Sequence, residues 1–218
     1  YSPVNYDGQF HGKLPLRVAL ASSLNVPATK VLSSYGVSQM IDIGEKLGIT
    51  TWQDKNRFGL ALTLGGGEIK MIDLAQIYSV LANLGNKIDI SPVLEVTDHQ
   101  GKIIYQHPCI GFENCPGKEV LNPGIAYILT DILADNQART LAFGPNSLLN
   151  YPDRKIAVKT GTSNNMRDNW CIGYNPNLLV ATWVGNNDNS PMSRVASGVT
   201  GATPIWRKTM DSLLLTNL

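Results

Sequence analysis

The chain has 218 residues, of which 43% are hydrophobic and 16% are charged, and its formal net charge is +1. These values are typical of a folded protein with one sizeable domain or two small ones. The near-neutral charge gives no electrostatic reason to expect a nucleic acid or an acidic membrane as a partner. No apolar run reaches the roughly 18 residues that a membrane span needs. The polar start, residues 1–13, has no leader pattern, so we expect it to lie within a longer protein.

The first predicted helices flank a short polar break. Apolar residues recur at helical spacing on both sides of residues 22–27, Ser-Ser-Leu-Asn-Val-Pro. Pro27 can stand in the first turn of the second helix, because its missing N–H breaks no hydrogen bond there. We therefore predict a helix, a break and a second helix, followed by a third helix that ends near Gly48.

Two longer amphipathic helices are predicted further along the chain, with a β-hairpin between them. The first helix follows the glycines at 65–67 and ends at Gly85, which is a suitable left-handed cap. The hairpin turns around residues 98–101. The second begins after Asn122, a good N-cap, with Pro123 in its first turn. The residues expected to face the core are Leu74, Ile77, Tyr78 and Leu81 in the first helix and Ile125, Ile128, Leu129 and Ile132 in the second.

From about residue 155 the pattern changes from helices to strands. Three apolar runs, 155–162, 169–174 and 178–186, are joined by short turn-prone sequences, which favour antiparallel neighbours. A closing helix over residues 204–215 is expected to pack back on the resulting sheet. We predict an α/β protein of the α+β kind, in which residues 1–218 belong to one domain, helical to about 145 and sheet-forming from about 155.

The cysteines and glycines do not indicate a metal or a cofactor. Cys109 and Cys115 lie in a loop-like segment and Cys171 in a strand-like one. A Cys109–Cys115 disulfide is possible if the protein is exported, but the paired spacing of zinc ligands is missing. The glycines at 65–67 match neither common phosphate-binding motif, so a bound nucleotide is not expected.

The end of the first predicted strand carries the clearest chemical signal, the sequence Lys159, Thr160, Gly161, Thr162. Gly161 lets a ligand approach the strand closely. Lys159 and Thr162 can together bind a carboxylate, and the backbone N–H of Thr162 can face an oxyanion. Alone this pattern is a weak signal, because strand ends followed by turns are common.

The break between the first two helices offers complementary groups. Ser23 and Asn25 are two residues apart, where both side chains can leave the helical surface. The hydroxyl of Ser23 could relay a proton, and the amide of Asn25 could hold a substrate carbonyl. Both residue types are also common helix caps, so the pair means little by itself. Its order in the chain, S-x-N between helices and then K-T-G on a strand, is more informative.

This order resembles that of two of the three motifs of penicillin-binding proteins and serine β-lactamases, which are S-x-x-K, S-x-N and K-T-G. The two motifs present here are S-x-N and K-T-G. Residues 5–28, 60–85, 159–186 and 197–211 look like transpeptidase domains of class A penicillin-binding proteins, and residues 137–163 are most similar to the 1C branch. The resemblance implies an incomplete penicillin-binding protein/serine β-lactamase-like transpeptidase fold, with an antiparallel sheet packed against helices.

The resemblance also implies a role for each matching residue. Ser23 would relay a proton, and Asn25 would bind the peptide substrate through its amide. Lys159 would support Ser23 and help to hold the terminal carboxylate of a D-Ala-D-Ala stem peptide or of a β-lactam. The strand that pairs with the substrate would be lined by Thr160, Gly161 and Thr162.

The family's nucleophile, the serine of S-x-x-K, has no counterpart among the 218 residues, because no lysine has a serine or threonine three places before it. Without that hydroxyl no acyl-enzyme forms, so we expect the chain alone to be inactive. We expect it to belong to a larger serine-type D,D-transpeptidase. That parent would be a bifunctional synthase with a glycosyltransferase domain upstream, anchored in the inner membrane and facing the periplasm.

The expected partners follow from the same resemblance. They are peptidoglycan stem peptides and, only with the upstream serine present, β-lactams. Nucleic acid is not expected, and a membrane is expected only through an N-terminal anchor. Apolar surface uncovered near the site makes self-association plausible. Two alternatives remain open: a pseudo-enzyme that binds peptide without cutting it, and a D,D-carboxypeptidase or β-lactamase-type hydrolase.

Overall fold

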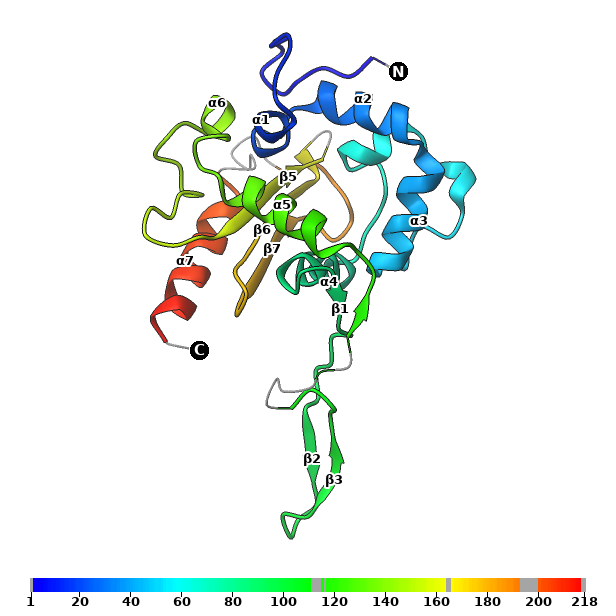
Figure 1. Cartoon of the computed structure of the whole chain (residues 1–218), viewed down its shortest axis with the longest axis vertical. Coiled ribbons are helices and arrows are strands. Elements are labelled where there is room, and N and C mark those ends of the chain that lie inside the picture. The colour runs from blue at the N-terminus through cyan, green and yellow to red at the C-terminus, as the bar shows by residue number, and fades with distance from the viewer. Residues whose placement is uncertain (1, 111–114, 116, 164–165, 193–199, 217–218) are drawn as a thin grey trace.

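The computed structural model describes residues 2–110, 115, 117–163, 166–192 and 200–216. Within them, helices surround a three-stranded sheet, and two further pairs of short strands form an arm (Figure 1). The helices are α1 (Leu16–Ala21), α2 (Asn25–Tyr35), α3 (Val37–Leu47), α4 (Met71–Ala82), α5 (Pro123–Ala134), α6 (Thr140–Phe143) and α7 (Ala202–Leu215), with the 3₁₀ helices η1 (Lys55–Arg57) and η2 (Leu60–Leu64). The strands are β1 (Asn86–Lys87), β2 (Glu95–Thr97), β3 (Ile103–Gln106), β4 (Lys118–Glu119), β5 (Ala157–Thr162), β6 (Asp168–Tyr174) and β7 (Leu179–Gly185).

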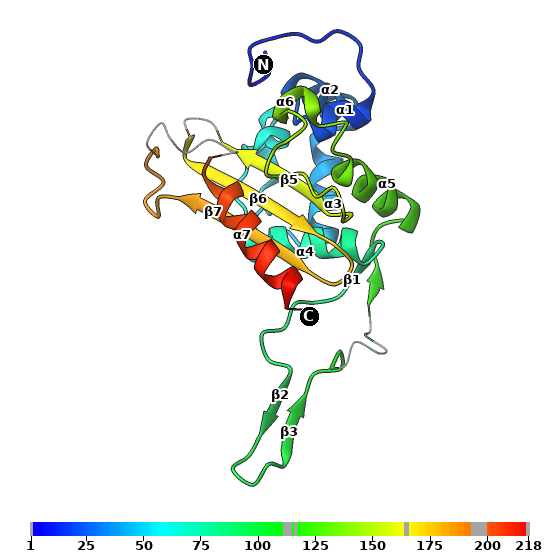
Figure 2. The same cartoon turned by 90° about the vertical axis from the view of Figure 1, so that its left-hand side faces the viewer.

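The central sheet is antiparallel with the strand order β5–β6–β7, which confirms the prediction from the short connections. Lys159 lies opposite Ile172 and Gly161 opposite Trp170, so the K-T-G residues are the third to fifth of the six residues of an edge strand. Helix α7 packs on one face of the sheet and helices α4 and α5 pack on the other (Figure 2). The predicted closing helix is therefore confirmed.

Each face of the sheet has its own hydrophobic core. Val158 and Trp206 belong to the core under α7, whereas Ala157 and Tyr174 belong to the core under α4 and α5. Adjacent residues of a strand point to opposite faces, which explains why Ala157 and Val158 lie in different cores. By the same alternation Lys159 points to the side of α4 and α5.

The predicted inward face of α5 is correct for only half of its residues. Ile132 is buried and Leu129 is partly buried, but Ile125 and Ile128 are 49% and 55% exposed, so the prediction is wrong for these two. The side that packs against the protein includes Ala126, which is fully buried. Helix α5 carries two overlapping apolar stripes, and the periodicity alone does not decide which one faces the sheet.

Most other helix predictions are confirmed. Asn122 caps α5 by accepting a hydrogen bond from the backbone N–H of Gly124 at 2.9 Å, and α3 ends at Gly48, which has a φ of 122°. In α4, Leu81 is buried and Gly85 has the expected positive φ of 91°. The remaining residues of the predicted α4 stripe are only partly buried: Leu74, Ile77 and Tyr78.

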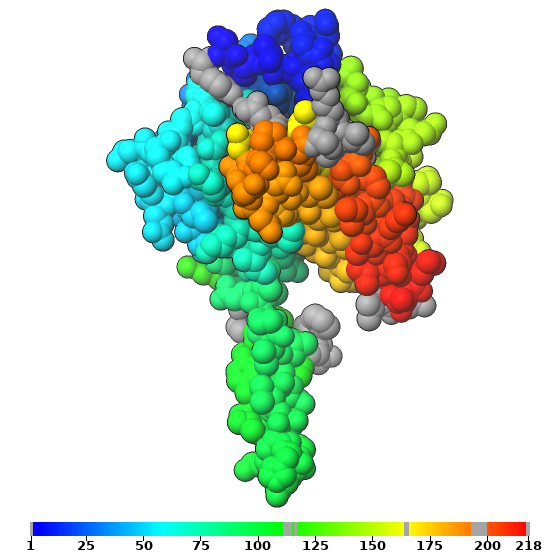
Figure 3. All heavy atoms as spheres, turned by 180° about the vertical axis from the view of Figure 1, so that it is seen from behind, coloured from blue at the N-terminus to red at the C-terminus, as the bar shows by residue number. Residues whose placement is uncertain are grey.

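The predicted hairpin is the tip of an arm that stands away from the rest of the molecule (Figures 1 and 3). Strands β2 and β3 are antiparallel, and every residue in them is exposed. The carboxylate of Asp98 accepts hydrogen bonds from the backbone N–H groups of Gln100 and Lys102, both at 2.9 Å, and Gly101 has a φ of 80°. This is the turn chemistry expected of an aspartate–glycine hairpin.

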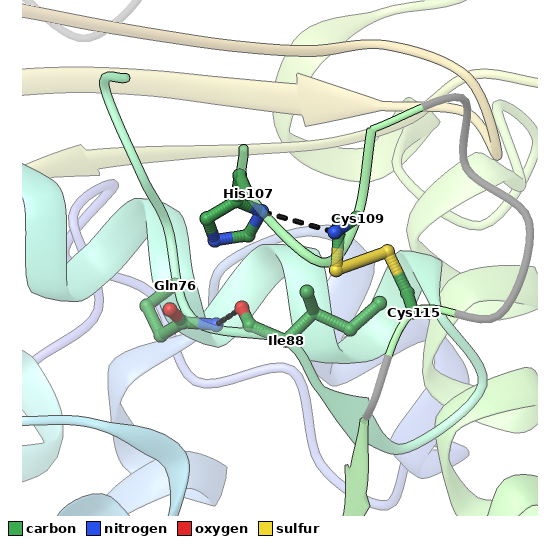
Figure 4. Close-up of a disulfide and its surroundings, with 5 residues drawn as sticks. All are labelled: Gln76, Ile88, His107, Cys109 and Cys115. Atoms are coloured by element: carbon green, nitrogen blue, oxygen red, sulfur yellow. Dashed lines mark hydrogen bonds between the residues drawn. A yellow bond between two sulfur atoms is a disulfide. The ribbon is translucent and has the colours of Figure 1, made fainter. Parts of the chain in front are cut away.

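Cys109 and Cys115 form a disulfide near the base of the arm (Figure 4). The backbone N–H of Cys109 also donates to Nδ1 of His107 at 3.1 Å. Beside this loop, Nε2 of Gln76 donates to the carbonyl of Ile88 at 3.0 Å and so ties the segment just after β1 to α4. Within the described ranges, no helix has both the length and the apolar character needed to cross a bilayer.

Candidate functional site

The structure brings the helix break and the edge strand into direct contact. Nζ of Lys159 lies 2.5 Å from Oγ of Ser23, although the two residues are 136 positions apart in the sequence. The same amine donates to the carbonyl of Thr160 at 2.7 Å. Helix α1 lies beside the end of β5 (Figures 1 and 2), so the break that follows α1 faces the edge of the sheet that carries K-T-G.

Ser23 reaches Lys159 because the backbone turns sharply at the end of α1. Its φ is 58°, in the left-handed region that usually takes glycine at a helix end. The turn is closed by hydrogen bonds from the N–H of Ser23 to the carbonyl of Leu20 at 3.1 Å and from the N–H of Leu24 to the carbonyl of Ala19 at 2.9 Å. A serine in this conformation costs about 1 kcal/mol. Here the strained position directs the hydroxyl of Ser23 toward Lys159.

Burial changes the acidity of Lys159. Burial, and after it the nearby positive charge of Arg139, lower the pKa of the amine from 10.5 to about 8, while Cys171 acts in the opposite direction. At pH 7 the group is therefore mainly an ammonium that donates to Ser23. The free amine, which can accept a proton from the hydroxyl, is reached at a much lower pH than for an exposed lysine.

The hydroxyl of Thr162 is oriented by a buried asparagine. Nδ2 of Asn169, which is fully buried, donates to Oγ1 of Thr162 at 3.2 Å, and its Oδ1 accepts from the N–H of Ala202 at 2.6 Å. Because Oγ1 of Thr162 accepts this bond, its own proton is free to point outward to an anion. Asn169 thus connects the start of α7 to the edge strand, and the sequence motifs did not indicate it.

The two other residues of the K-T-G-T sequence differ in exposure. The side chain of Thr160 is buried, on the α7 side of the sheet, so only its backbone lies along the edge. Gly161 is partly exposed, and a Cβ placed there would come no closer than 3.6 Å to another residue, the nearest being Trp170. Room for close approach along the strand therefore exists at Gly161.

The turn after β5 is held by Asp168 at the start of β6. Its carboxylate accepts hydrogen bonds from Oγ of Ser163 at 2.9 Å and from Nε1 of Trp183 at 3.0 Å. The neighbouring Arg167 donates instead to the carbonyl of Asn189. These contacts fix the end of the edge strand that carries Thr162.

Asn25 is the first residue of α2, two positions after Ser23. Its Nδ2 donates to the carbonyl of Val4 at 2.9 Å. In the other direction, Oδ1 of the buried Asn5 accepts from the N–H of Val26 at 3.1 Å. The N-terminal segment, residues 2–13, therefore lies against the start of α2 (Figures 1 and 3). One N–H of the Asn25 amide and its carbonyl oxygen make no hydrogen bond to the described residues.

Replacing Asn5 by alanine tests whether this segment supports the site. No side chain of α2 caps its own N-terminus, so Asn5 satisfies one of the unpaired N–H groups from outside the helix. We expect Asn5→Ala to lower the free energy of unfolding by about 1–2 kcal/mol, measured by urea denaturation. Asp7→Ala in the same segment is the control, because Asp7 is exposed, and it should have a smaller effect. Equal stability of the two variants would contradict this role.

The assembled groups can bind an anion and relay a proton, but they offer no activated nucleophile of the S-x-x-K type. Among the described residues, no group of three or more histidines, cysteines or acids lies close enough to hold a metal ion. A hollow of about 500 Å³ lies between the end of α4 and Pro176, away from every motif residue. Among the described residues β5 pairs with β6 alone, so the candidate site lies at a strand edge.

Comparison with known families gives a match over most of the chain. The family model described as the penicillin binding protein transpeptidase domain matches residues 3–211. Penicillin-binding protein 1A of Neisseria flavescens is 32% identical over 207 residues, which cover 94% of this chain and 25% of the relative. Penicillin-binding protein 1A of Aquifex aeolicus is 29% identical, with 94% of this chain and 26% of the relative covered. The chain thus spans about a quarter of the length of these relatives.

Solved structures show the same fold. Penicillin-binding protein 1A from Haemophilus influenzae superposes with a TM-score of 0.80 at 21% identity, covering 98% of this chain and 36% of that one. The PonA1 protein from Mycobacterium tuberculosis, solved in complex with penicillin V, has a TM-score of 0.80 at 24% identity, covering 97% and 59% of the two chains. These relatives are not of the 1C type, so the assignment to the 1C branch stays a prediction.

Proposed function

Because the chain belongs to the penicillin-binding protein transpeptidase family, we propose that it forms part of a D,D-transpeptidase that cross-links peptidoglycan stem peptides. The observation that carries this proposal is the contact between Ser23 and Lys159. It joins the S-x-N and K-T-G motifs at an open strand edge, where an extended peptide could pair with β5.

The proposed roles follow from the chemistry of each group. Lys159 and the free hydroxyl proton of Thr162 bind the terminal carboxylate of a D-Ala-D-Ala peptide. Ser23 passes a proton between the lysine of the S-x-x-K motif and the amine that leaves or attacks, and Lys159 supports Ser23 electrostatically. Asn25 holds the peptide through the part of its amide that Val4 does not use. The backbone of Thr160 and Gly161 lies along the edge that pairs with the substrate.

We further propose that the acyl-forming serine lies in sequence outside these 218 residues, which contain no S-x-x-K. The chain then represents the C-terminal portion of one transpeptidase domain, helical over about 1–145 and sheet-forming over about 155–218. Its parent is a class A synthase with a glycosyltransferase domain, anchored in the inner membrane and acting at the periplasmic face. The 25% coverage of the curated relatives supports this larger context.

The proposal predicts that the chain alone is not acylated by penicillin. After incubation with a fluorescent penicillin, a denaturing gel should show no labelled band, because no hydroxyl is activated as the nucleophile. A longer chain that adds the preceding coding sequence with its S-x-x-K should be labelled. Its Ser23→Ala variant should be labelled more slowly, because the proton relay is lost. Labelling of the 218-residue chain, or no labelling of the longer chain, would contradict the proposal.

A second function, peptide binding without catalysis, is favoured by one observation. The groups that hold a carboxylate are assembled in a chain that lacks the nucleophile. Titration of the 218-residue chain with a peptide ending in D-Ala-D-Ala, followed by NMR, measures this binding directly. If the peptide binds in this titration and the longer chain is not labelled by penicillin, the binding function is supported over the transpeptidase function.

A further inference from the structure

A buried arginine lies beside the candidate site and belongs to none of the three motifs. Arg139, just before α6, is only 2% exposed. Its Nε donates to the carbonyl of Asp135 at 3.4 Å, and its Nη2 donates to the carbonyl of Leu133. In the part of the chain that the structure describes, Arg139 forms no ion pair with a carboxylate.

An unpaired buried cation is costly, because the protein interior solvates charge poorly and buried charges are normally paired. The nearest acid of its own loop, Asp135, is engaged elsewhere. Its Oδ1 accepts from the N–H of Ala138 at 3.0 Å, and its Oδ2 accepts from Nη1 of Arg17 at 3.2 Å. The charge of Arg139 is therefore fixed in place by two backbone carbonyls and is not neutralised by direct contact.

The loop that holds Arg139 also supports the serine turn of the site. The carbonyl of Ala138, the preceding residue, accepts a hydrogen bond from Oγ of the buried Ser22 at 3.0 Å. Ser22 is adjacent to Ser23, whose hydroxyl contacts Lys159. The loop of residues 133–139 is thus connected to the position of Ser23 by the hydrogen bond from the Ser22 hydroxyl to the backbone carbonyl of Ala138.

Among the described residues, two charged or titratable groups add to the effect of burial on Lys159. Arg139 opposes its protonation, and Cys171 on β6 acts in the opposite direction. Burial raises the pKa of the Cys171 thiol to about 12, so below that pH it is neutral and supplies no counter-charge. The Ser23 hydroxyl is uncharged. Burial is the main cause of the lowered pKa of Lys159, and Arg139 is the fixed charge that lowers it further.

We propose that Arg139 is a positioning residue of this site: its fixed, buried charge opposes protonation of Lys159, and its loop holds the Ser22–Ser23 turn against that amine. The role of Arg139 in catalysis rests on the proposed transpeptidase function, but its effect on Lys159 does not. The electrostatic coupling is a property of the 218-residue chain itself and can be measured there.

The test is an NMR titration of lysine side chains in the 218-residue chain, with Lys159 assigned by its disappearance in Lys159→Arg. In the wild type, Lys159 should titrate near pH 8. In Arg139→Gln its titration midpoint should move up by at least half a pH unit. Arg139→Lys retains the charge and should keep the midpoint close to that of the wild type.

The matched control is Arg17→Gln, which removes a partly exposed cation of α1 and breaks its bonds to Asp131 and to Asp135 of the Arg139 loop. A merely structural role of the loop would make Arg17→Gln shift Lys159 as Arg139→Gln does, and that result would overturn the proposal. An unchanged midpoint in Arg139→Gln would overturn it as well. If Arg139→Gln does not fold, an elevated midpoint in Arg139→Lys is the contradicting result.

The titration and the penicillin assay fail independently. If the longer chain is not labelled but the titration midpoint of Lys159 shifts in Arg139→Gln of the 218-residue chain, the transpeptidase function is refuted and the coupling stands. Normal labelling with an unshifted Lys159 would refute the coupling and leave the function intact.

Discussion

Replacing Lys159 by methionine is expected to stabilise the fold at pH 7 rather than to weaken it. The pKa of this amine is lowered from 10.5 to about 8 in the folded protein, so the folded state binds its proton less tightly than the unfolded state does. The full difference corresponds to roughly 3 kcal/mol. Partial exposure and the lost hydrogen bonds to Ser23 and Thr160 reduce the expected gain to about 1–2 kcal/mol.

The pH dependence gives this prediction its distinctive signature. The penalty for the buried ammonium is fully present below about pH 8 and falls away between pH 8 and 10.5. Urea unfolding of the wild type should therefore show stability rising over that range relative to Lys159→Met. The advantage of the variant should be large at pH 7 and nearly absent above pH 10.5.

Lys155→Met is the control on the same side of the molecule. Lys155 is largely exposed and forms an ion pair with Asp131 at 2.7 Å, so its loss should cost at most about 0.5 kcal/mol. A loss of stability in Lys159→Met at pH 7, or a gain that does not change with pH, would show that burial of the charge is not what lowers its pKa.

Such a gain would identify Lys159 as a residue kept at the expense of stability. The strained backbone of Ser23 and the buried charge of Arg139 are two further costs at the same place. Costs of this kind gather where a protein holds reactive groups in a fixed geometry. The proposed function accounts for all three, because proton relay needs an amine that can lose its proton beside a fixed hydroxyl.

The elements that the sequence predicted well are those with local signals. The turn at Asp98–Gly101 and the cap at Asn122 depend on residues within four positions of each other. The strands β5, β6 and β7 follow from apolar runs with short connections. The orientation of α5 depends on what packs against it, and for that reason Ile125 and Ile128 were placed on the wrong face.

The same distinction applies to the site. The motifs indicated Ser23 and Lys159, and the structure places their side chains in contact. Their supports were not predictable, because most of them act across a long sequence separation and none has a local sequence signal. Ser22 binds the loop of Arg139, Thr162 depends on Asn169 and on the start of α7, and the start of α2 depends on Asn5. None of these supporting residues belongs to a recognisable pattern.

Substitution by alanine should strongly destabilise the fold at one glycine of the central sheet and have little effect on stability at another. A Cβ at Gly173 on β6 would lie 2.3 Å from Cζ2 of Trp206 and 3.0 Å from the carbonyl of Ala157. Trp206 is fully buried and packs edge-on against Tyr151, with ring centroids 6.0 Å apart, so its indole has nowhere to move. Gly173→Ala should cost about 3 kcal/mol or more, because the clash forces α7 away from the sheet.

Gly161→Ala on the neighbouring strand is the matched variant. Its new Cβ has room, with no atom closer than 3.6 Å, and alanine is slightly better than glycine within a strand. Stability measured by urea unfolding should therefore change by less than about 1 kcal/mol. In the longer chain, however, the added methyl group would stand at the open edge and should slow labelling by penicillin. Equal stability losses in the two variants would mean that contact with Trp206 does not set the spacing between α7 and β6. A fast-labelled Gly161→Ala would mean that the ligand does not approach β5 at this residue.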